Sequence, residues 1–289
     1  MTRPCLPARE VTSAPLRRMP PGGTDCHFHI IGPADRYPYI AERAYTPPDE
    51  LVPQYQKMAR TLGIERMVVV QPSVYGHDNR CTLDSVELLG RRNTRAIVVI
   101  DDSVKDATLK DMAARGTVGI RVNTVLKGGT PPAQVTSLAK RLAPIGWHIQ
   151  VWSHDEQLVD LAPILEGLPL PVVLDHMGGV HSARGLDSPE FTAMMRLIER
   201  GNTWVKISGY RASSAGYPYA DVTPIAQKLI AAAPERCVWG TDWPHPSMFG
   251  TMHMPDDGEL LNLLREWEPS DTLWQKILVD NPARLYGFA

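Results

Sequence analysis

The chain has 289 residues, and its 30 Lys and Arg against 32 Asp and Glu give a formal net charge of −2 at pH 7. This balance, without a dense basic run, argues against a nucleic-acid partner. A hydrophobic fraction of 43% supplies a sizeable core, yet no segment is long and apolar enough to span a bilayer, so neither a disordered chain nor a membrane protein is expected.

The chain begins with a segment rich in Pro and Arg, which lacks the unbroken apolar stretch of a secretion signal. We predict that residues 1–20 form a flexible N-terminal arm. The four cysteines, Cys5, Cys26, Cys81 and Cys237, are scattered, without the pairs of a zinc ribbon or the density of a disulfide scaffold. They are typical of reduced thiols, so we expect a cytoplasmic protein.

After the arm, one alternation recurs about eight times: a short apolar run, a polar or Gly- and Pro-rich turn, and a longer segment with helical spacing. Runs such as MVVV and AIVVI indicate strands buried on both faces, as in a parallel sheet covered by helices. Residues 21–289 are therefore predicted to form a single-domain (β/α)8 TIM barrel. The predicted strands are Thr24–Ile30, Arg66–Gln71, Arg95–Ile100, Val118–Asn123, His148–Ser153, Val172–Asp175, Thr203–Ser208 and Cys237–Thr241.

The helices between them show the same regularity. They are predicted over Glu50–Leu62, Cys81–Arg92, Lys105–Arg115, Pro132–Ala143, Glu156–Glu166, Pro189–Arg200, Asp221–Ala233 and Gly258–Trp267, with a further one over Leu273–Asn281. We find no change in composition that would indicate a second domain.

The first predicted strand carries two histidines, His27 and His29. Because side chains alternate along a strand, both imidazoles should face the barrel interior together with Asp25, while Cys26 and Phe28 face the helices. Two buried imidazoles need hydrogen bonds, an ionic partner or a metal ion. A pair of hydrogen-bonded core histidines remains the alternative.

Two further polar residues follow later strands. His176 ends the sixth strand in LDHMGG, and Asp242 ends the eighth in WGTDWPHP. Barrel enzymes collect their catalytic groups at this end of the strands, so we expect both residues to meet His27 and His29 at one mouth of the barrel. For Asp242, a helix N-cap is the structural alternative.

Several motifs carry a family resemblance. The H-x-H strand, DHMG, GTDWPHP and the terminal DNPARLYG resemble the amidohydrolase superfamily. QPSVYGHDNR, GIRVN, GWHIQVW, WVKISG and MPDDG are similar, more narrowly, to the 2-pyrone-4,6-dicarboxylate lactonase group, which contains lactone hydrolases and sugar-lactone isomerases. The resemblance covers about residues 20 to 289.

The resemblance implies roles for the four residues. Asp242 would activate water as general base, and His27, His29 and His176 would polarise the lactone carbonyl. A metal-free site is favoured, because strand four offers Arg121 and Asn123 in place of a bridging ligand. One divalent ion, with zinc the foremost candidate, stays open as the alternative, and its ligands would be His27, His29 and Asp242.

The resemblance also implies a small carboxylated lactone as substrate, bound by guanidinium and hydroxyl groups. Lys127 and Trp152 stand where the pyrone lactonase has other residues, which weakens the case for the pyrone dicarboxylate itself, and Tyr75 stands where the lactonase has a histidine. Arg121 has a structural ion pair as its alternative role, and the spacing around Arg211 is shifted by about one residue. The full set of expected substrate contacts is Tyr45, Ser73, Tyr75, Arg121, Lys127, Trp152 and Arg211.

These features favour hydrolysis of a pyrone- or muconolactone-like carboxylated lactone from aromatic catabolism. A sugar-acid lactone isomerase of the galactarolactone type would use the same site. A metal-dependent decarboxylase and a non-catalytic binding barrel are the remaining alternatives. The oligomeric state is open.

Overall fold

A parallel eight-stranded sheet forms the centre of the computed structural model, which describes residues 2–289. Each strand pairs with the next one along the chain, as successive β-helix-β units require. The strands are β2 (Thr24–Phe28), β4 (Arg66–Val70), β5 (Thr94–Val98), β6 (Thr117–Asn123), β7 (His148–Trp152), β8 (Val172–Leu174), β9 (Thr203–Lys206) and β10 (Cys237–Val238).

The sheet closes on itself between β2 and the segment that follows β10. The amide of Cys26 donates to the carbonyl of Trp239 at 3.0 Å, and the amide of His29 donates to Trp243 at 2.8 Å. A Cβ on Gly240 would lie 2.6 Å from the nitrogen of His27, so the two backbones approach closely there. The predicted (β/α)8 barrel is confirmed, although its last strand is shorter than expected.

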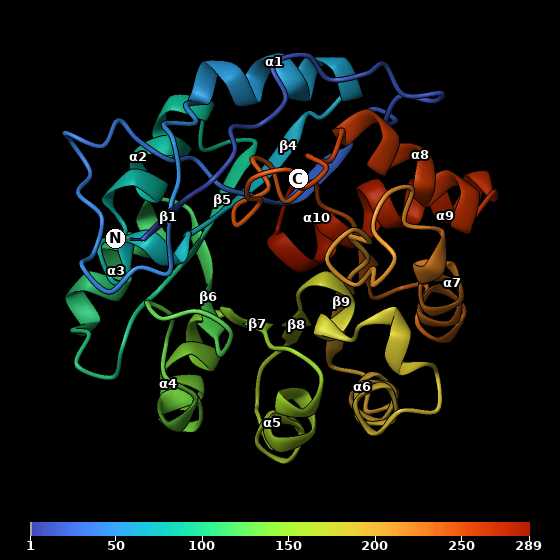
Figure 1. The fold of residues 1–289 in the computed structure, drawn as a ribbon. Helices are drawn as coiled ribbons and strands as arrows, with labels where there is room; N and C mark the ends of the chain where they lie inside the picture. Colours follow the sequence, from blue (N-terminus) through green and yellow to red (C-terminus); the bar gives the residue numbers. More distant parts are fainter. Residues whose placement is uncertain (1) are drawn as a thin grey trace.

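Helices surround this ring of strands (Figure 1). Among the helices of residues 2–289, none is long and apolar enough to cross a bilayer. The predicted helix over Leu273–Asn281 is present, and it lies in a continuous helical run in which the π-helical turn Lys276–Asp280 joins two short α-helices. The helices are α1 (Val52–Leu62), α2 (Arg80–Leu89), α3 (Asp106–Ala114), α4 (Val135–Leu142), α5 (Glu156–Glu166), α6 (Pro189–Glu199), α7 (Thr223–Ala232), α8 (Asp257–Trp267), α9 (Asp271–Gln275) and α10 (Asn281–Tyr286).

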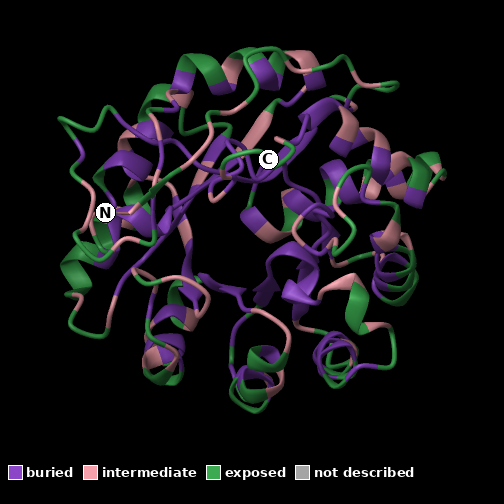
Figure 2. Cartoon of the chain, in the orientation of Figure 1, coloured by how far each residue is buried: buried purple, intermediate pink, exposed green. Residues whose placement is uncertain are grey.

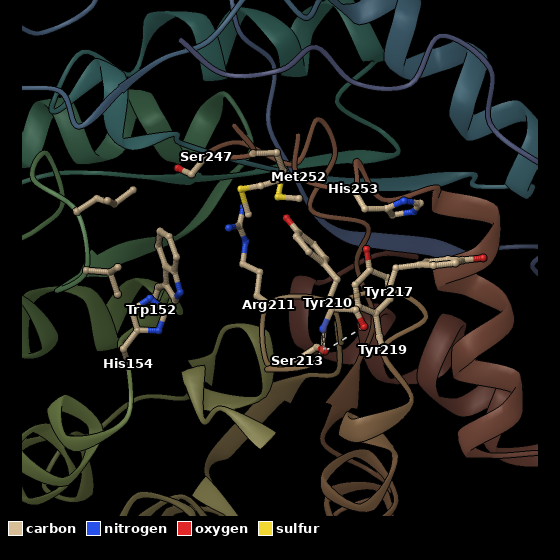
Figure 3. Close-up of a pocket in the computed structure, with 14 residues that line it drawn as sticks. Trp152, His154, Tyr210, Arg211, Ser213, Tyr217, Tyr219, Ser247, Met252 and His253 are labelled. Carbon is tan, nitrogen blue, oxygen red and sulfur yellow. Dashed lines mark hydrogen bonds between the residues drawn. The ribbon is translucent and has the colours of Figure 1, made fainter. Parts of the chain in front are cut away.

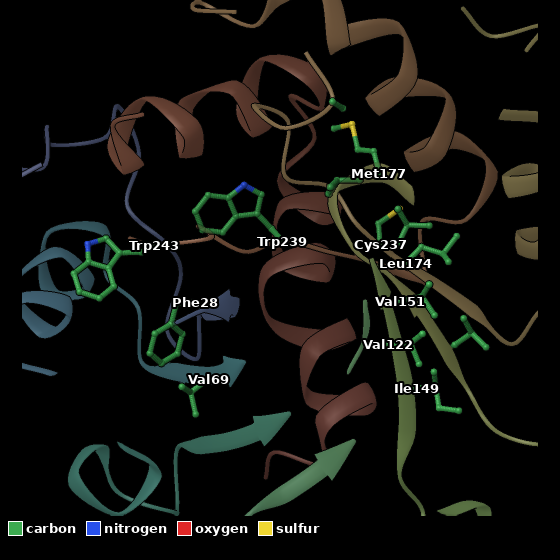
Figure 4. Close-up of a cluster of buried hydrophobic side chains, with 14 of the residues drawn as sticks. Phe28, Val69, Val122, Ile149, Val151, Leu174, Met177, Cys237, Trp239 and Trp243 are labelled. Atoms are coloured by element: carbon green, nitrogen blue, oxygen red, sulfur yellow. The ribbon is translucent and has the colours of Figure 1, made fainter. Parts of the chain in front are cut away.

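The barrel wall separates two apolar clusters. The larger one lies between strands and helices, where Ile149 and Val151 of β7 point outward (Figure 4). The smaller one fills the interior. It includes Val68 of β4, Val173 of β8 and, from the C-terminal helix, Tyr286. Buried residues accordingly line the ring and the inner faces of the helices, while the outer helix faces are exposed (Figure 2).

A bulge in β2 changes the expected side-chain pattern. The pairing of β2 with β4 shifts register between Asp25 and Phe28, and a bulge breaks the strict alternation of faces. Cys26 therefore belongs to the interior cluster, whereas Asp25 accepts a hydrogen bond from Tyr55 of α1 at 3.1 Å. The prediction for these two residues was wrong, while Phe28 packs outward as expected, stacked on Tyr55.

The N-terminal segment is docked on the barrel, in contrast to the flexible arm that the sequence predicts. Strand β1 (Arg3–Pro4) pairs with β3 (Tyr45–Thr46) in parallel. The amide of Ala8 donates to Glu50 Oε1 at 2.8 Å, and Met19 is buried. Backbone amides and one apolar side chain of the N-terminal segment therefore contact the barrel, which composition alone does not reveal.

Candidate active site

Four side chains that are remote in sequence meet at the C-terminal ends of the strands. His27 and His29 come from β2 and the residue after it, His176 follows β8, and Asp242 follows β10; each is at most 1% exposed. Asp242 Oδ1 lies 3.3 Å from His29 Nε2 and 3.5 Å from His27 Nε2. Asp242 Oδ2 lies 3.8 Å from His176 Nε2. The structure thus brings together the four residues that the sequence places at one mouth.

The backbone at two of these residues is left-handed. Asp242 has φ 62° and His176 has φ 49°, values that side-chain-bearing residues rarely adopt and that cost about 1–3 kcal/mol each. The amide of Asp242 donates to the carbonyl of His27 at 2.7 Å, which ties the turn to β2. The N-cap interpretation of Asp242 was wrong, because the next helix, α8, begins at Asp257 and is capped by Asp256.

Asp242 is held as a carboxylate. Burial alone would raise its pKa, but the Arg211 guanidinium holds that pKa well below its usual range. Arg211 Nε donates to Asp242 Oδ2, and the hydroxyl of Tyr210 donates to the same oxygen at 2.5 Å. The other oxygen, Oδ1, faces the histidines. Asp242 is therefore ionised near neutral pH.

Hydrogen bonds determine which imidazole nitrogens carry protons. His29 Nδ1 lies 2.7 Å from the carbonyl oxygen of Val70, which can only accept, so Nδ1 is protonated. Burial lowers the pKa of His29, so the ring is neutral and its Nε2 bears a lone pair. His27 Nδ1 lies 3.3 Å from the carboxylate of Asp175, an acceptor, and 3.4 Å from Lys206 Nζ, a donor, so these contacts select neither tautomer. The His29 ring presents an acceptor to Asp242 Oδ1.

Facing acceptors repel unless a cation or a proton donor lies between them. Within residues 2–289, His27 Nε2, His176 Nε2 and Asp242 Oδ1 are buried without a hydrogen-bond partner. The ligand atoms of His27, His29 and Asp242 lie within 4.8 Å of one another, and so do those of His27, Asp175 and His176. Two neutral imidazoles and a carboxylate are ligands that a divalent ion such as zinc prefers. The residues present fit such an ion.

A buried ionic layer supports the histidines from below. Lys206 Nζ lies 2.6 Å from Gln150 Oε1, 3.3 Å from Asp175 Oδ1 and 3.4 Å from His27 Nδ1. Arg121 Nε lies 3.4 Å from Asp175 Oδ2, the ion pair considered as its alternative role. Neither Lys206 nor Asp175 was predicted from the sequence as part of the site. The alternation of β9, WVKISG, was the available signal, since it turns Lys206 inward when Val205 faces the helices.

A pocket of about 430 Å³ lies next to these groups, and Figure 3 shows its lining. Trp152, Tyr210 and Arg211 belong to this lining, and Tyr210 and Arg211 also donate to the buried carboxylate of Asp242. The guanidinium carbons of Arg121 and Arg211 lie 5.2 and 5.4 Å from the centre of the Trp152 ring, within range of cation–π attraction. Trp152 thus links the cationic groups of the site.

The other expected substrate contacts divide into two groups. Tyr45 and Ser73 are buried beside the cationic groups: burial raises the pKa of Tyr45 to about 12, while Ser73, Arg121 and Arg211 oppose the rise. Tyr75 is buried away from the pocket, and its hydroxyl accepts from the amide of Gly32 at 2.8 Å.

The loop after β6 lines the pocket differently from the expectation. Lys127 is exposed and lies outside the pocket lining, to which the same loop contributes Val125 and Leu126. His154 also lines the pocket and stacks on His181 with ring centres 5.1 Å apart. The structure thus offers no support for Lys127 as a substrate contact.

Comparison with known proteins identifies the family. Residues 24–288 match the model of a family described as amidohydrolase. The chain belongs to this family. The amidohydrolase is 41% identical to a 4-sulfomuconolactone hydrolase of Hydrogenophaga intermedia over 94% of its own length and 91% of that protein. It is 37% identical to a 2-pyrone-4,6-dicarboxylate hydrolase of Comamonas testosteroni, covering 95% and 93% of the two chains.

Two further similarities concern Agrobacterium proteins. The amidohydrolase is 33% identical to a D-galactarolactone isomerase of Agrobacterium fabrum, covering 95% of this chain and 94% of the isomerase. A solved apo structure from Agrobacterium tumefaciens superposes with a TM-score of 0.89 at 32% identity, covering 97% of this chain and 99% of that one. Both confirm that the whole barrel is shared.

Proposed function

We propose that this amidohydrolase opens the ring of lactones that carry an anionic substituent, of the pyrone- or muconolactone-like kind formed in aromatic catabolism. The relatives named for such lactones cover more than nine-tenths of the chain. The observation that carries the proposal is the ionised carboxylate of Asp242, which lies among three imidazoles beneath a pocket bordered by Arg211. The cytoplasmic location of this amidohydrolase stays a prediction, which rests on its scattered cysteines.

The residues of the site divide the chemistry between them. The anionic substituent of the substrate pairs with Arg211 and approaches Arg121, with Tyr45 and Ser73 as hydroxyl donors. This places the lactone carbonyl over the histidines. Asp242 orients a water molecule toward the carbonyl carbon and takes its proton as the C–O bond forms. The ring C–O bond then breaks, and the proton passes to the departing oxygen.

We further propose that one divalent cation, zinc the foremost candidate, is held by His27, His29 and Asp242. The tautomer of His29 is the reason, because a bare Nε2 cannot donate a hydrogen bond to the developing oxyanion. When bound, such an ion polarises the carbonyl and lowers the pKa of water. This departs from the metal-free site that the resemblance favours.

Metal analysis of the purified chain tests this second proposal. We expect about one equivalent of metal, an increase in Tm when zinc is added to chelated protein, and loss of both in His29→Gln. His253→Gln is the control, since His253 is exposed at the pocket. If the protein binds no metal and keeps full turnover in chelator, the proposal of a bound cation is wrong, while the proposed lactone chemistry is unaffected.

A panel of anionic lactones tests the reaction itself. Hydrolysis gives a linear acid that contains one oxygen from ¹⁸O-labelled water. Asp242→Asn should lower the rate by about 10²–10⁴-fold, the usual contribution of a general base, while the exposed Asp187→Asn serves as control. If the chain opens none of the lactones, the proposed function is wrong.

An isomerase is the second candidate, because the galactarolactone isomerase relative covers the same barrel. The two reactions differ in which oxygen attacks the carbonyl. A hydroxyl group of the substrate would attack in the isomerase, and the product would remain a lactone without solvent ¹⁸O. The labelling experiment therefore distinguishes the two, and release of carbon dioxide would instead indicate a decarboxylase.

A further inference from the structure

The pocket has one charged end and one apolar side. Arg211 and Tyr210 form the end that lies over Asp242. The side is built by the loop after β6, the loop after β9 and the segment after β10 (Figure 3). Its apolar and aromatic members are Val125, Leu126, Tyr217, Tyr219, Met248 and Met252.

Cationic groups are scarce along this pocket. In the described part of the chain, Arg211 is the one Lys or Arg of the lining. Arg121 lies deeper, is 3% exposed and is paired with Asp175. Burial lowers the pKa of His154, so this residue is neutral near pH 7. A second anionic group on the substrate would therefore enter the apolar side without a paired charge, which is costly.

The size of the pocket indicates a substituent on the lactone. A single six-membered ring fits a cavity of about 150 Å³, whereas this pocket measures about 430 Å³. The space beyond one ring is bounded by the thioether and aliphatic side chains of Met248, Met252 and Leu126. Methionine adapts its shape to irregular apolar groups, which suits an alkyl or aryl substituent.

We propose that the preferred substrate carries one anionic group, directed at Arg211, and an apolar substituent of about ring size, received by Leu126, Met248 and Met252. This inference rests on the proposed function, since it names the class of lactone that the site opens. It separates this chain from relatives whose names imply a second anionic group, the sulfomuconolactone and pyrone-dicarboxylate hydrolases.

A matched pair of pyrones tests the inference. The first is 2-pyrone-4,6-dicarboxylate, and the second is 4-phenyl-2-pyrone-6-carboxylate, in which a phenyl group replaces one carboxylate. We expect the phenyl compound to have the lower KM by about tenfold or more, since contacts in an apolar pocket commonly discriminate by this factor. Met252→Arg should narrow or invert the ratio, while Leu88→Arg, a change at a remote exposed position on α2, should leave it unchanged.

Binding to Asp242→Asn, measured by calorimetry, gives the same comparison without turnover. Tighter binding of the phenyl compound supports the inference even when no lactone is opened, so the failure of the proposed function is distinguishable. Preference of the wild-type chain for the dicarboxylate would overturn the inference. An unchanged ratio in Met252→Arg would also overturn it.

Discussion

The buried lysine beneath the histidines makes a direct test of how the site is held together. Lys206 and Asp175 are both 0% exposed, and their charged atoms are 3.3 Å apart. Lys206→Met keeps most of the side-chain volume and removes the cation. Asp175 is then left with Arg121 at 3.4 Å and His27 at 3.3 Å, and Gln150 Oε1 loses its donor.

The size of the effect follows from the burial. Removing one member of a buried ion pair costs about 3–5 kcal/mol when the remaining charge has no other partner. Asp175 keeps Arg121 as a cationic partner, so we expect the lower end, about 3 kcal/mol. Unfolding entropy of about 2.1 cal/mol/K per residue gives about 0.6 kcal/mol/K for 289 residues. The midpoint of thermal unfolding should therefore fall by about 5 °C.

The assay is scanning calorimetry or circular dichroism of Lys206→Met beside Lys276→Met. Lys276 bonds to Glu235 at 3.0 Å on the surface, where an ion pair contributes about 1 kcal/mol or less. The control should shift Tm by less than about 2 °C. Equal shifts in the two variants would refute the reasoning, because they would mean that the buried lysine is no better paired than the exposed one.

Three further outcomes are expected. Tyr210→Phe removes a donor to Asp242 that contributes about 1.5–3 kcal/mol, so the pKa of Asp242 should rise by about one to two units. The acid limb of the pH profile of kcat/KM should therefore move to higher pH. An acid limb that stays in place contradicts this prediction. His148 is buried with its pKa lowered to about 3, so it takes up a proton only on unfolding. This residue alone should lower the free energy of unfolding by up to about 1.4 kcal/mol per pH unit below pH 6.5. In urea titrations His148→Gln should reduce the measured slope by that amount. Deleting residues 2–9 removes the hydrogen bond from the amide of Leu6 to the carbonyl of Met248, a residue of the pocket lining. Steady-state kinetics should then show a higher KM with little change in kcat. An unchanged KM would mean that the N-terminal segment does not position the pocket.

The barrel was predictable because its pattern is carried by many residues at once. Runs such as MVVV and AIVVI mark strands buried on both faces, and eight of them alternate with helical segments. The register shift in β2 was not predictable, because a bulge depends on how two strands pair. Asp25 and Cys26 consequently face opposite sides from those predicted.

The site was predictable only as far as strand ends determine it. His176 and Asp242 follow strands, and parallel strands in a barrel bring such residues to one mouth. The partners of these residues come from across the barrel, as Lys206 does, or from loops, as Tyr210 and Arg211 do. Distances of this kind depend on loop conformation, and for the same reason Lys127 lies outside the pocket that Leu126 lines.

The proton on His29 connects the fold to the chemistry. Val70 is the last residue of β4, and its carbonyl accepts from His29 Nδ1 at 2.7 Å. The partner is a backbone group, so the position of the strand end sets the tautomer and no change of the Val70 side chain removes that partner. A neutral His29 then presents a lone pair to Asp242 Oδ1 at 3.3 Å. Oxyanion stabilisation by this ring would require its protonation, which burial opposes, so a cation between the two groups is the arrangement that the fold favours.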